Sequence, residues 1–443
     1  MNLHRQLSES VGAEHVALDA NQRVDFVLRG LFPDLVVSPG TLGELAEVMA
    51  AAYAAGATII PWGGGTRQAL GGEIEPHGPT LVVRTARLNH VLEYEPGDLT
   101  ISVEAGATMT EVSTLLAPHN QMLPVDVALP ARSTIGGTLA TAADGPRRLG
   151  YGTTRDLLIG IKVVEATGRM SRAGGMVVKN VSGFDMMKLY VGSMGTLAVI
   201  ASANFKLIPR PRAAATLLVV MPSIDVAFNL VDAIHTSQLV PTAVELMMGT
   251  ASYRARLLAL SDLLDISGPL VLLAICTEGL PAAVARHLRE LETMAKAKEA
   301  LTTLRIADEA HTHLWSHIAD FAQIATIERN EVVLRLHTLP SDQVRAIADA
   351  VALARGHATA LLVDARALSG VTYLRLRLSS LDLLTSYQRA LSSRWPNLVV
   401  LIGPSLPKDV PIWGREPEGF ALMQRIKAEF DPQNRLNPGR YIV

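Results

Sequence analysis

Two glycine-rich segments in the first half of the chain have the composition of phosphate-binding loops. The first, Gly63-Gly64-Gly65-Thr66, follows an expected strand at 58–61, and the second, Gly136-Gly137, opens an expected helix at 138–143. Successive backbone N–H groups in such loops can line an anion-binding concavity, and the missing side chains let a pyrophosphate approach. A tight surface turn is the alternative for either loop alone. Two such loops in one domain favour a large dianionic cofactor.

The common nucleotide-binding signatures are missing, because neither G-x-x-x-x-G-K-[ST] nor G-x-G-x-x-G occurs. The chain has 40 basic and 42 acidic residues, and a net charge of -2 offers no strong field for a polyanion. We therefore expect no nucleic-acid partner.

The length of 443 residues predicts two large domains or three modest ones, at roughly 150 residues per domain. The single cysteine, Cys276, excludes an internal disulfide and a cysteine metal cluster, and it fits a reducing compartment. The first ten residues lack the apolar core of a secretory signal, and no stretch approaches the ~18–20 apolar residues that span a bilayer. We expect a cytoplasmic protein without a transmembrane segment.

The elements that must position the loops follow from hydrophobic spacing and turn residues. The first part of the chain predicts a helix at 41–55, strands at 58–61, 80–83, 99–104 and 157–166, and a helix that Thr108 and Glu111 open as a capping box. Thr167-Gly168 predicts the turn of a hairpin whose second strand is 176–178. Residues 192–203 are expected to form a turn and another strand. After Pro209 and Pro211 the sequence changes to expected strands and helices of similar length with few glycine clusters. This change predicts a domain boundary at 209–214.

The second domain is expected to be an α+β layer, with helices packed over one face of a sheet. Its predicted strands are 216–221, 242–248, 270–274, 332–336, 360–363 and 373–378, with helices at 224–235 and 281–294 among the connections. Another helix is expected at 418–429, followed by turn-forming residues to 440.

Several ordered segments carry a family resemblance: Pro61 through Thr66, Gly106, Pro130 through Gly137, Gly145, Tyr151-Gly152, Asp156 and Gly192 through Leu197. They resemble the FAD-binding domain of the vanillyl-alcohol oxidase and p-cresol methylhydroxylase superfamily. The Phe-Asp-Pro and Leu-Asn-Pro-Gly turns at 430–439 resemble the close of its glycolate oxidase and D-lactate dehydrogenase branch. Within that branch, 178–185 and 413–415 are most similar to the FAD-binding subunits of bacterial glycolate oxidases.

The resemblance implies an α+β fold with a two-subdomain FAD-binding domain at 1–210, an α+β cap or substrate domain at 211–410, and a C-terminal segment at 411–443 that returns to the FAD domain. It implies that the loop at 63–67 holds the pyrophosphate and that Gly195 to Ile200 lie beside the adenine. The full set of expected cofactor-binding residues is Pro61, Gly63, Gly64, Gly65, Thr66, Arg67, Pro130, Thr134, Ile135, Gly136, Gly137, Gly145, Gly152, Asp156, Gly195, Thr196, Ile200 and Asn437. For Asn437, an ordinary turn residue is the alternative.

Two departures from the family pattern shape the functional expectation. Thr66 stands where flavin-tethering relatives often carry a nearby histidine, and the expected FAD domain has no cysteine, so FAD should bind non-covalently. The cap lacks the H-x-G-D-G-N-x-H metal motif of the catalytic branch members. This absence favours an accessory subunit over direct oxidation of a 2-hydroxy acid by this chain.

Other candidate residues have ordinary explanations. His313 and His317, at i and i+4, could chelate a metal together with His311, but no familiar ligand pattern completes them, and we expect no metal site. The catalytic residues stay unknown. Arg335, Arg375 and Arg377 on predicted strands are weak candidates for a substrate carboxylate, against an ordinary polar strand face.

We therefore expect an FAD-dependent oxidoreductase that acts on a small 2-hydroxy acid such as glycolate. The resemblance implies a second flavoprotein subunit and an iron-sulfur subunit as partners, with peripheral attachment to the inner face of the membrane through them as an option. One alternative is a self-sufficient dehydrogenase of another alcohol or hydroxy acid. The other is an assembly subunit in which FAD is structural.

Overall fold

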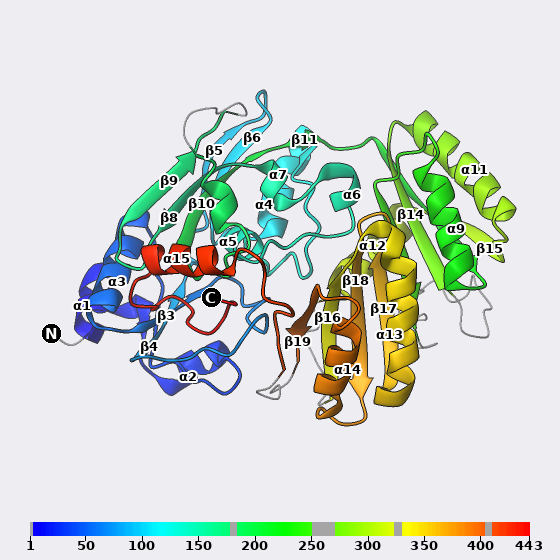
Figure 1. The fold of residues 1–443 in the computed structure, drawn as a ribbon. Helices are drawn as coiled ribbons and strands as arrows, with labels where there is room; N and C mark the ends of the chain where they lie inside the picture. The colour runs from blue at the N-terminus through cyan, green and yellow to red at the C-terminus, as the bar shows by residue number, and fades with distance from the viewer. Residues whose placement is uncertain (1–2, 178–183, 250–270, 323–329, 404–409) are drawn as a thin grey trace. The chain divides into compact units, whose positions relative to one another are not determined.

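The computed structural model describes residues 3–177, 184–249, 271–322, 330–403 and 410–443 (Figure 1). The motif residues 178–183 and the expected strand start at Leu270 lie outside this part of the chain. The chain forms two compact units. The first comprises 1–144, 152–210 and 416–443, and the second comprises 145–151 and 211–415.

The first unit begins with a four-stranded sheet whose order is β1-β2-β4-β3. Its strands are β1 (Val16–Ala17), β2 (Leu35–Val37), β3 (Thr58–Trp62) and β4 (Thr80–Arg84), with β4 parallel to both β2 and β3. Helix α3 (Leu42–Ala54) packs Leu45, Val48 and Met49 into the core. Thr41 caps this helix by accepting a hydrogen bond from the Glu44 backbone N–H at 3.1 Å.

A five-stranded antiparallel sheet, ordered β5-β6-β10-β8-β9, forms the rest of the unit's framework. Its strands are β5 (Val91–Glu95), β6 (Thr100–Glu104), β8 (Leu158–Val164), β9 (Met170–Gly174) and β10 (Val199–Lys206). The predicted hairpin exists, but its second strand starts at 170 and not at 176, because Val164 pairs directly with Met170 across a tight turn.

Helices connect and cover these strands. Helix α4 (Met109–Leu116) opens with the predicted capping box, in which Thr108 and Glu111 bond reciprocally. Helix α5 (Ile135–Ala140) starts earlier than predicted, because Thr134 is its N-cap. The remaining elements are α1 (Leu3–Val11), α2 (Ala20–Arg23), α7 (Thr154–Leu157), α8 (Met187–Tyr190), β7 (Gln121–Met122), β11 (Ile208–Pro209) and α15 (Phe420–Phe430).

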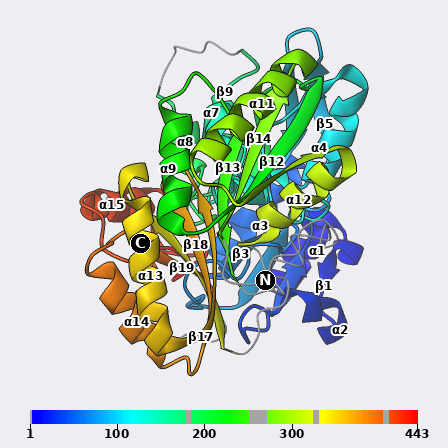
Figure 2. The same cartoon turned by 90° about the vertical axis from the view of Figure 1, so that its right-hand side faces the viewer.

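The second unit is built on one eight-stranded antiparallel sheet ordered β15-β12-β14-β13-β17-β18-β16-β19. The strands are β12 (Ala213–Met221), β13 (Ala243–Met248), β14 (Val271–Gly279), β15 (Thr302–Ala307), β16 (Glu331–His337), β17 (Ala358–Arg366), β18 (Val371–Leu378) and β19 (Leu398–Ile402). Helices α9 (Ile224–His235), α11 (Pro281–Ala297), α13 (Gln343–His357) and α14 (Leu383–Ser392) pack their apolar residues on one face (Figure 2).

The expectation that helices cover only one face was wrong. Helix α12 (Asp308–Asp320) packs Leu314 and Ile318 on the opposite face, against Leu218 and Leu272. The short helix α6 (Arg148–Tyr151) also belongs to this unit. Strand β15 was not predicted, because this edge strand buries only Ile306 and its apolar alternation is limited to Leu304 and Ile306.

Candidate active site

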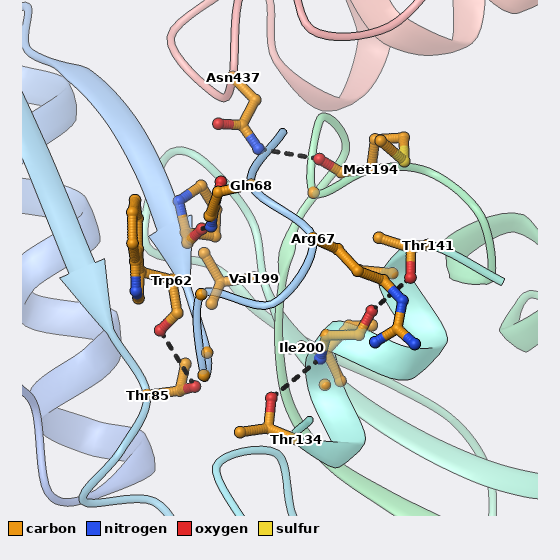
Figure 3. Close-up of a pocket in the computed structure, with 18 of the residues that line it drawn as sticks. Trp62, Arg67, Gln68, Thr85, Thr134, Thr141, Met194, Val199, Ile200 and Asn437 are labelled. Atoms are coloured by element: carbon orange, nitrogen blue, oxygen red, sulfur yellow. Dashed lines mark hydrogen bonds between the residues drawn. The ribbon is translucent and has the colours of Figure 1, made fainter. Parts of the chain in front are cut away.

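The first unit contains a cavity whose walls come from five separate stretches of the chain (Figure 3). The space between its walls is about 690 Å³, which includes open solvent. The lining residues are Pro61, Trp62, Gly63, Gly64, Gly65, Thr66, Arg67, Gln68, Thr85, Thr134, Gly136, Gly137, Ala140, Thr141, Met194, Gly195, Ala198, Val199, Ile200, Asn437 and Arg440.

The two glycine-rich loops pack against each other. A Cβ atom on Gly63 would overlap the Oγ1 atom of Thr134, and one on Gly64 would overlap the carbonyl oxygen of Arg132. The hydroxyl groups of Thr66 and Ser133 lie 3.1 Å apart and join the loops further along. The glycines therefore permit close approach of two backbone segments, so that both sequence signals belong to one structure.

The start of α5 needs small residues for a similar reason. Thr134 accepts a hydrogen bond from the Gly137 N–H at 3.3 Å, which fixes the first turn of the helix. A Cβ atom on Gly136 would lie 2.8 Å from the Cβ atom of Ala105. Glycine at 136 thus allows the cavity-lining turn to pack directly on the end of β6.

The C-terminal tail supplies the polar wall of the cavity. Asn437 has a φ of 44° in the left-handed region, and its Nδ2 donates to the Met194 carbonyl at 2.8 Å. Its Oδ1 atom is buried and has no hydrogen-bond partner in the described part of the chain. Such an acceptor costs free energy unless a ligand donates to it. A flavin or ribose donor would satisfy this requirement.

Arg440 brings a buried positive charge to the same wall. Its Nη2 donates to Gln68 Oε1 at 2.5 Å, whereas its buried Nη1 has no partner among the described residues. Burial, together with the nearby charge of Arg29, lowers the pKa of Arg440 to about 9. An anionic group in the cavity would relieve this cost. The donor set therefore suits a dinucleotide with a pyrophosphate.

A buried ion pair holds the tail in place. Lys427 Nζ donates to Asp431 Oδ2 at 2.6 Å and to the carbonyl oxygens of Thr196 and Leu436. Asp431 Oδ2 also accepts from the Leu436 N–H at 2.7 Å. The ion pair thus connects α15 and the tail to the turn at 193–196, which faces Asn437.

The structure gathers many of the predicted cofactor residues around this cavity. Those that line it are Pro61, Gly63, Gly64, Gly65, Thr66, Arg67, Thr134, Gly136, Gly137, Gly195, Ile200 and Asn437. Pro130, Ile135, Gly152, Asp156 and Thr196 do not line it, and Gly145 belongs to the second unit.

The residues that do not line the cavity have local roles. Ile135 is buried in the core of the first unit, and Thr196 donates its hydroxyl to the Ser193 carbonyl. Asp156 accepts from Thr153 in a capping box. The sequence analysis missed Gln68 and Arg440, which are 372 residues apart. Only the turn-rich tail hinted at the second of them.

The second unit carries a polar surface on the sheet face opposite α13 and α14. Arg375 there donates to both carboxylate oxygens of Glu331, at 2.6 and 2.8 Å, so its charge is already neutralised. Arg377 is exposed. Arg335 is half-buried, and its Nε is buried without a hydrogen-bond partner in the described ranges. Of the three predicted arginines, Arg335 is thus the one with a free buried donor.

Three charged residues with little solvent exposure lie on the same face. Glu245 of β13 pairs in register with Arg366 of β17, and Asp364 lies two residues before Arg366. Burial raises the pKa of Asp364 to about 6, because the charged carboxylate is poorly solvated there. Arg366 also lies 5.0 Å from the centre of the Tyr373 ring. The Asp364 carboxyl group could therefore exchange a proton near pH 6.

Family comparison identifies both parts of the chain. Residues 33–174 match the FAD binding domain family, and residues 210–366 and 413–441 match the C-terminal domain of FAD linked oxidases. The chain therefore combines an FAD binding domain with a C-terminal domain of the FAD linked oxidase type. It is an FAD-dependent oxidoreductase, and the first of these matched ranges includes both glycine-rich loops.

Individual relatives cover most of this chain. Glycolate oxidase subunit GlcD of Bacillus subtilis is 27% identical over 92% of this chain and 88% of its own length. D-lactate dehydrogenase of Archaeoglobus fulgidus is 27% identical over 92% of this chain and 91% of its own. Glycolate oxidase subunit GlcE of Escherichia coli is 37% identical, but over 32% of this chain and 40% of its own length.

Solved structures share the fold. A 4-ethylphenol oxidase from Gulosibacter chungangensis matches with a TM-score of 0.76 and 14% identity, covering 99% of this chain and 96% of that chain. p-Cresol methylhydroxylase matches with a TM-score of 0.70 and 15% identity over the same shares. The expected fold of the vanillyl-alcohol oxidase type is confirmed. Among the described residues, no helix combines the length and apolar character needed to span a membrane.

Proposed function

We propose that this chain is the FAD-binding subunit of a glycolate oxidase or related 2-hydroxy-acid dehydrogenase complex. The observation that carries the proposal is the glycine-lined cavity with its unpaired Asn437 oxygen and buried Arg440, in a chain whose relatives include glycolate oxidase subunits and D-lactate dehydrogenase. The relatives named for 2-hydroxy acids support this substrate class.

The chain's own residues supply binding and orientation for the cofactor. Backbone N–H groups of 63–67 would hold the pyrophosphate, and Arg440, which lines the same cavity, would contribute positive charge. The Asn437 oxygen accepts from a polar edge of the dinucleotide. When bound, FAD accepts a hydride from an alcohol carbon and passes electrons to another carrier.

FAD binds non-covalently in this proposal. None of the residues that line the described cavity is a histidine, cysteine or tyrosine, and these side chains are the ones that could form a bond to the flavin ring. Acid precipitation tests the point directly. Yellow flavin should remain in the supernatant, whereas flavin that stays with the pellet after washing would contradict non-covalent binding.

The rival assignment, a self-sufficient dehydrogenase, would bind its substrate on the polar sheet face of the second unit. A small 2-hydroxy acid presents a carboxylate, which a guanidinium group binds well, and a hydroxyl that must lose a proton. Arg335 has a free buried donor, and the buried Asp364 and Glu245 could accept a proton. Arg375 is the weaker candidate because Glu331 already occupies its donors.

The partners in this proposal are a second flavoprotein subunit and an iron-sulfur subunit. Attachment to the inner face of the membrane would then come through these partners. The match to both GlcD and GlcE proteins supports a multi-subunit assembly. Pull-down of the tagged chain from its native host should bring down both kinds of subunit.

The activity test compares the isolated chain with the reconstituted complex. The isolated, FAD-loaded chain should show little turnover of glycolate or D-lactate with an artificial electron acceptor, and turnover should appear when the partners are added. Robust turnover by the isolated chain, lost in Arg335→Ala, would contradict the accessory role and support a self-sufficient dehydrogenase. An active complex whose rate does not depend on FAD in this chain would indicate an assembly subunit.

A further inference from the structure

Three potential metal ligands meet in the second unit, on the sheet face that α12 covers. Cys276 and Glu278 lie two residues apart on β14 and therefore point to the same face. His311 comes from the first turn of α12. One possible ligand atom from each residue, the sulfur, a carboxylate oxygen and a ring nitrogen, lies within 4.8 Å of the other two.

The ligand chemistry matches zinc. Zn²⁺ accepts thiolate, imidazole and carboxylate ligands together, with bonds of about 2.3 Å to sulfur and ~2.0–2.2 Å to nitrogen or oxygen. Ligand atoms in a tetrahedral shell lie roughly 3.3–3.8 Å apart by these bond lengths. The three side chains would therefore have to approach one another by at most about 1.5 Å, which small changes of their torsion angles can provide.

The surroundings of the cluster resemble an outer ligand shell. Thr216, which pairs in register with Cys276, has its hydroxyl 2.8 Å from His311 Nδ1. The Trp315 Nε1 donates to the same hydroxyl at 2.8 Å. Because Nδ1 has this partner, a metal would be bound through Nε2. Such outer contacts orient ligating histidines in known metal sites.

The carboxylate has a similar outer contact. The Tyr151 hydroxyl donates to Glu278 Oε2 at 2.8 Å, and Arg147 Nη1 lies 3.5 Å from Oε1. Each carboxylate oxygen has two lone pairs, so these contacts leave capacity for a metal. The Glu278 side chain is only 5% exposed, and Cys276 is 1% exposed. A metal bound there would be well shielded from bulk water.

We propose that Cys276, Glu278 and His311 form a zinc site in the second unit, with the fourth position filled by water or a small ligand. The site joins the middle of β14 to α12, independently of the FAD cavity in the first unit. It differs from the sequence expectation of no metal, because its ligands come from segments 33 residues or more apart and have no motif spacing.

Zinc X-ray absorption on the FAD-loaded wild-type chain provides the sharpest test. One zinc per chain should bind, with one sulfur at about 2.3 Å and lighter ligands at ~2.0–2.2 Å. The chain has a single cysteine, so a thiolate in the zinc shell can come only from Cys276. A shell of nitrogen and oxygen alone, or no zinc after dialysis, would overturn the proposal. This result does not depend on any variant folding.

Variants then assign the other ligands through competition with a zinc chelator. His311→Ala and Glu278→Gln should each weaken zinc binding by about 100-fold or more, beyond the ~10–100-fold that loss of an outer-shell partner costs. Thr216→Val should weaken it by about tenfold. Arg147→Gln should tighten it, because it removes a positive charge beside the carboxylate. Circular dichroism identifies any variant that has not folded.

His313 and His317 provide the matched control on the same helix. Their ring centres are 4.2 Å apart, and His317 Nδ1 lies 3.0 Å from the His313 carbonyl oxygen. This surface pair could bind zinc on its own. The double variant His313→Ala and His317→Ala should keep the zinc site and its sulfur ligand. Loss of the bound zinc in this double variant would overturn the proposal in favour of the surface pair.

Discussion

Gly64 faces the backbone carbonyl of Arg132 so closely that even a methyl group at position 64 would overlap the oxygen atom. From the sequence, Gly64 is predicted to let a pyrophosphate approach the backbone. The structure adds that the loop itself is packed on its neighbour there. A substitution at Gly64 should therefore disturb both the cavity wall and the binding of FAD.

Gly64→Ala should lower the free energy of unfolding by about 1–3 kcal/mol, which is typical of overpacking, and should weaken FAD binding. Thermal unfolding and flavin fluorescence of the released cofactor measure the two effects. Gly97→Ala is the matched control, since no atom lies within 4 Å of its added Cβ. Equal FAD retention in the two variants would show that the loop at 63–66 does not contact the cofactor.

Asn437 should matter through both its amide and its backbone. Asn437→Ala removes the donor to Met194 and places alanine at a φ of 44°, so we expect a loss of about 2–3 kcal/mol in stability and weaker FAD binding. Asn437→Gly tolerates this φ but still lacks the amide. If the glycine variant binds FAD like the wild type in isothermal titration, the unpaired Oδ1 does not contact the cofactor.

Lys427→Met should destabilise the chain by about 3–5 kcal/mol, because it leaves the buried Asp431 carboxylate without its cation. The tail should loosen and FAD retention should fall. Urea unfolding and the flavin content of the purified protein measure these effects. The double variant Lys427→Met and Asp431→Asn should recover part of the lost stability. No recovery would show that the lysine acts through packing and not through its charge.

Asp364→Asn tests the raised pKa of the buried carboxyl group. The pKa of Asp364 is about 6 in the folded chain, above the ordinary 3.8. Its contribution to the free energy of unfolding is therefore fully present below pH ~4 and is lost as the pH rises through 6. The asparagine variant cannot ionise. Its stability relative to the wild type should therefore rise by about 1–3 kcal/mol between pH 4 and 7.

Chemical unfolding at a series of pH values measures the effect of Asp364→Asn. Asp232→Asn, at an exposed position on α9, is the matched control and should leave the pH profile parallel to that of the wild type. A difference between Asp364→Asn and the wild type that does not change with pH would mean that Asp364 titrates normally.

The sequence predicts local structure well where the signal is local. The Thr108 and Glu111 capping box and the helix at 224–235 appear where the spacing indicates. The turn at Thr167-Gly168 lies where it was predicted, but the second strand of the hairpin was misplaced, because the pairing of Val164 with Met170 depends on strand register, which turn residues alone do not fix. The packing of helix α12 on the sheet face opposite α13 and α14 was not predicted, because this contact depends on tertiary packing.

The candidate sites show the same limit. The glycine loops were visible because glycine is an unusual residue to repeat after a strand. Arg440 and its partner Gln68 were not, since 372 residues separate them and only the folded tail brings them together. The cluster of Cys276, Glu278 and His311 likewise depends on the pairing of β12 with β14 and on the position of α12. Sequence spacing contains neither relationship.

The bridge between Ile59 and Leu436 has a consequence for synthesis on the ribosome. The edge of β3 pairs with the last residues of the chain, and the cavity lacks Asn437 and Arg440 until those residues emerge. Translation adds about 5–20 residues per second, so the first unit waits roughly 10–50 s after residue 210 for its own tail. Nascent chains should therefore capture FAD only after residue 440 has emerged, and a chain truncated before Leu436 would present an open strand edge to the chaperones.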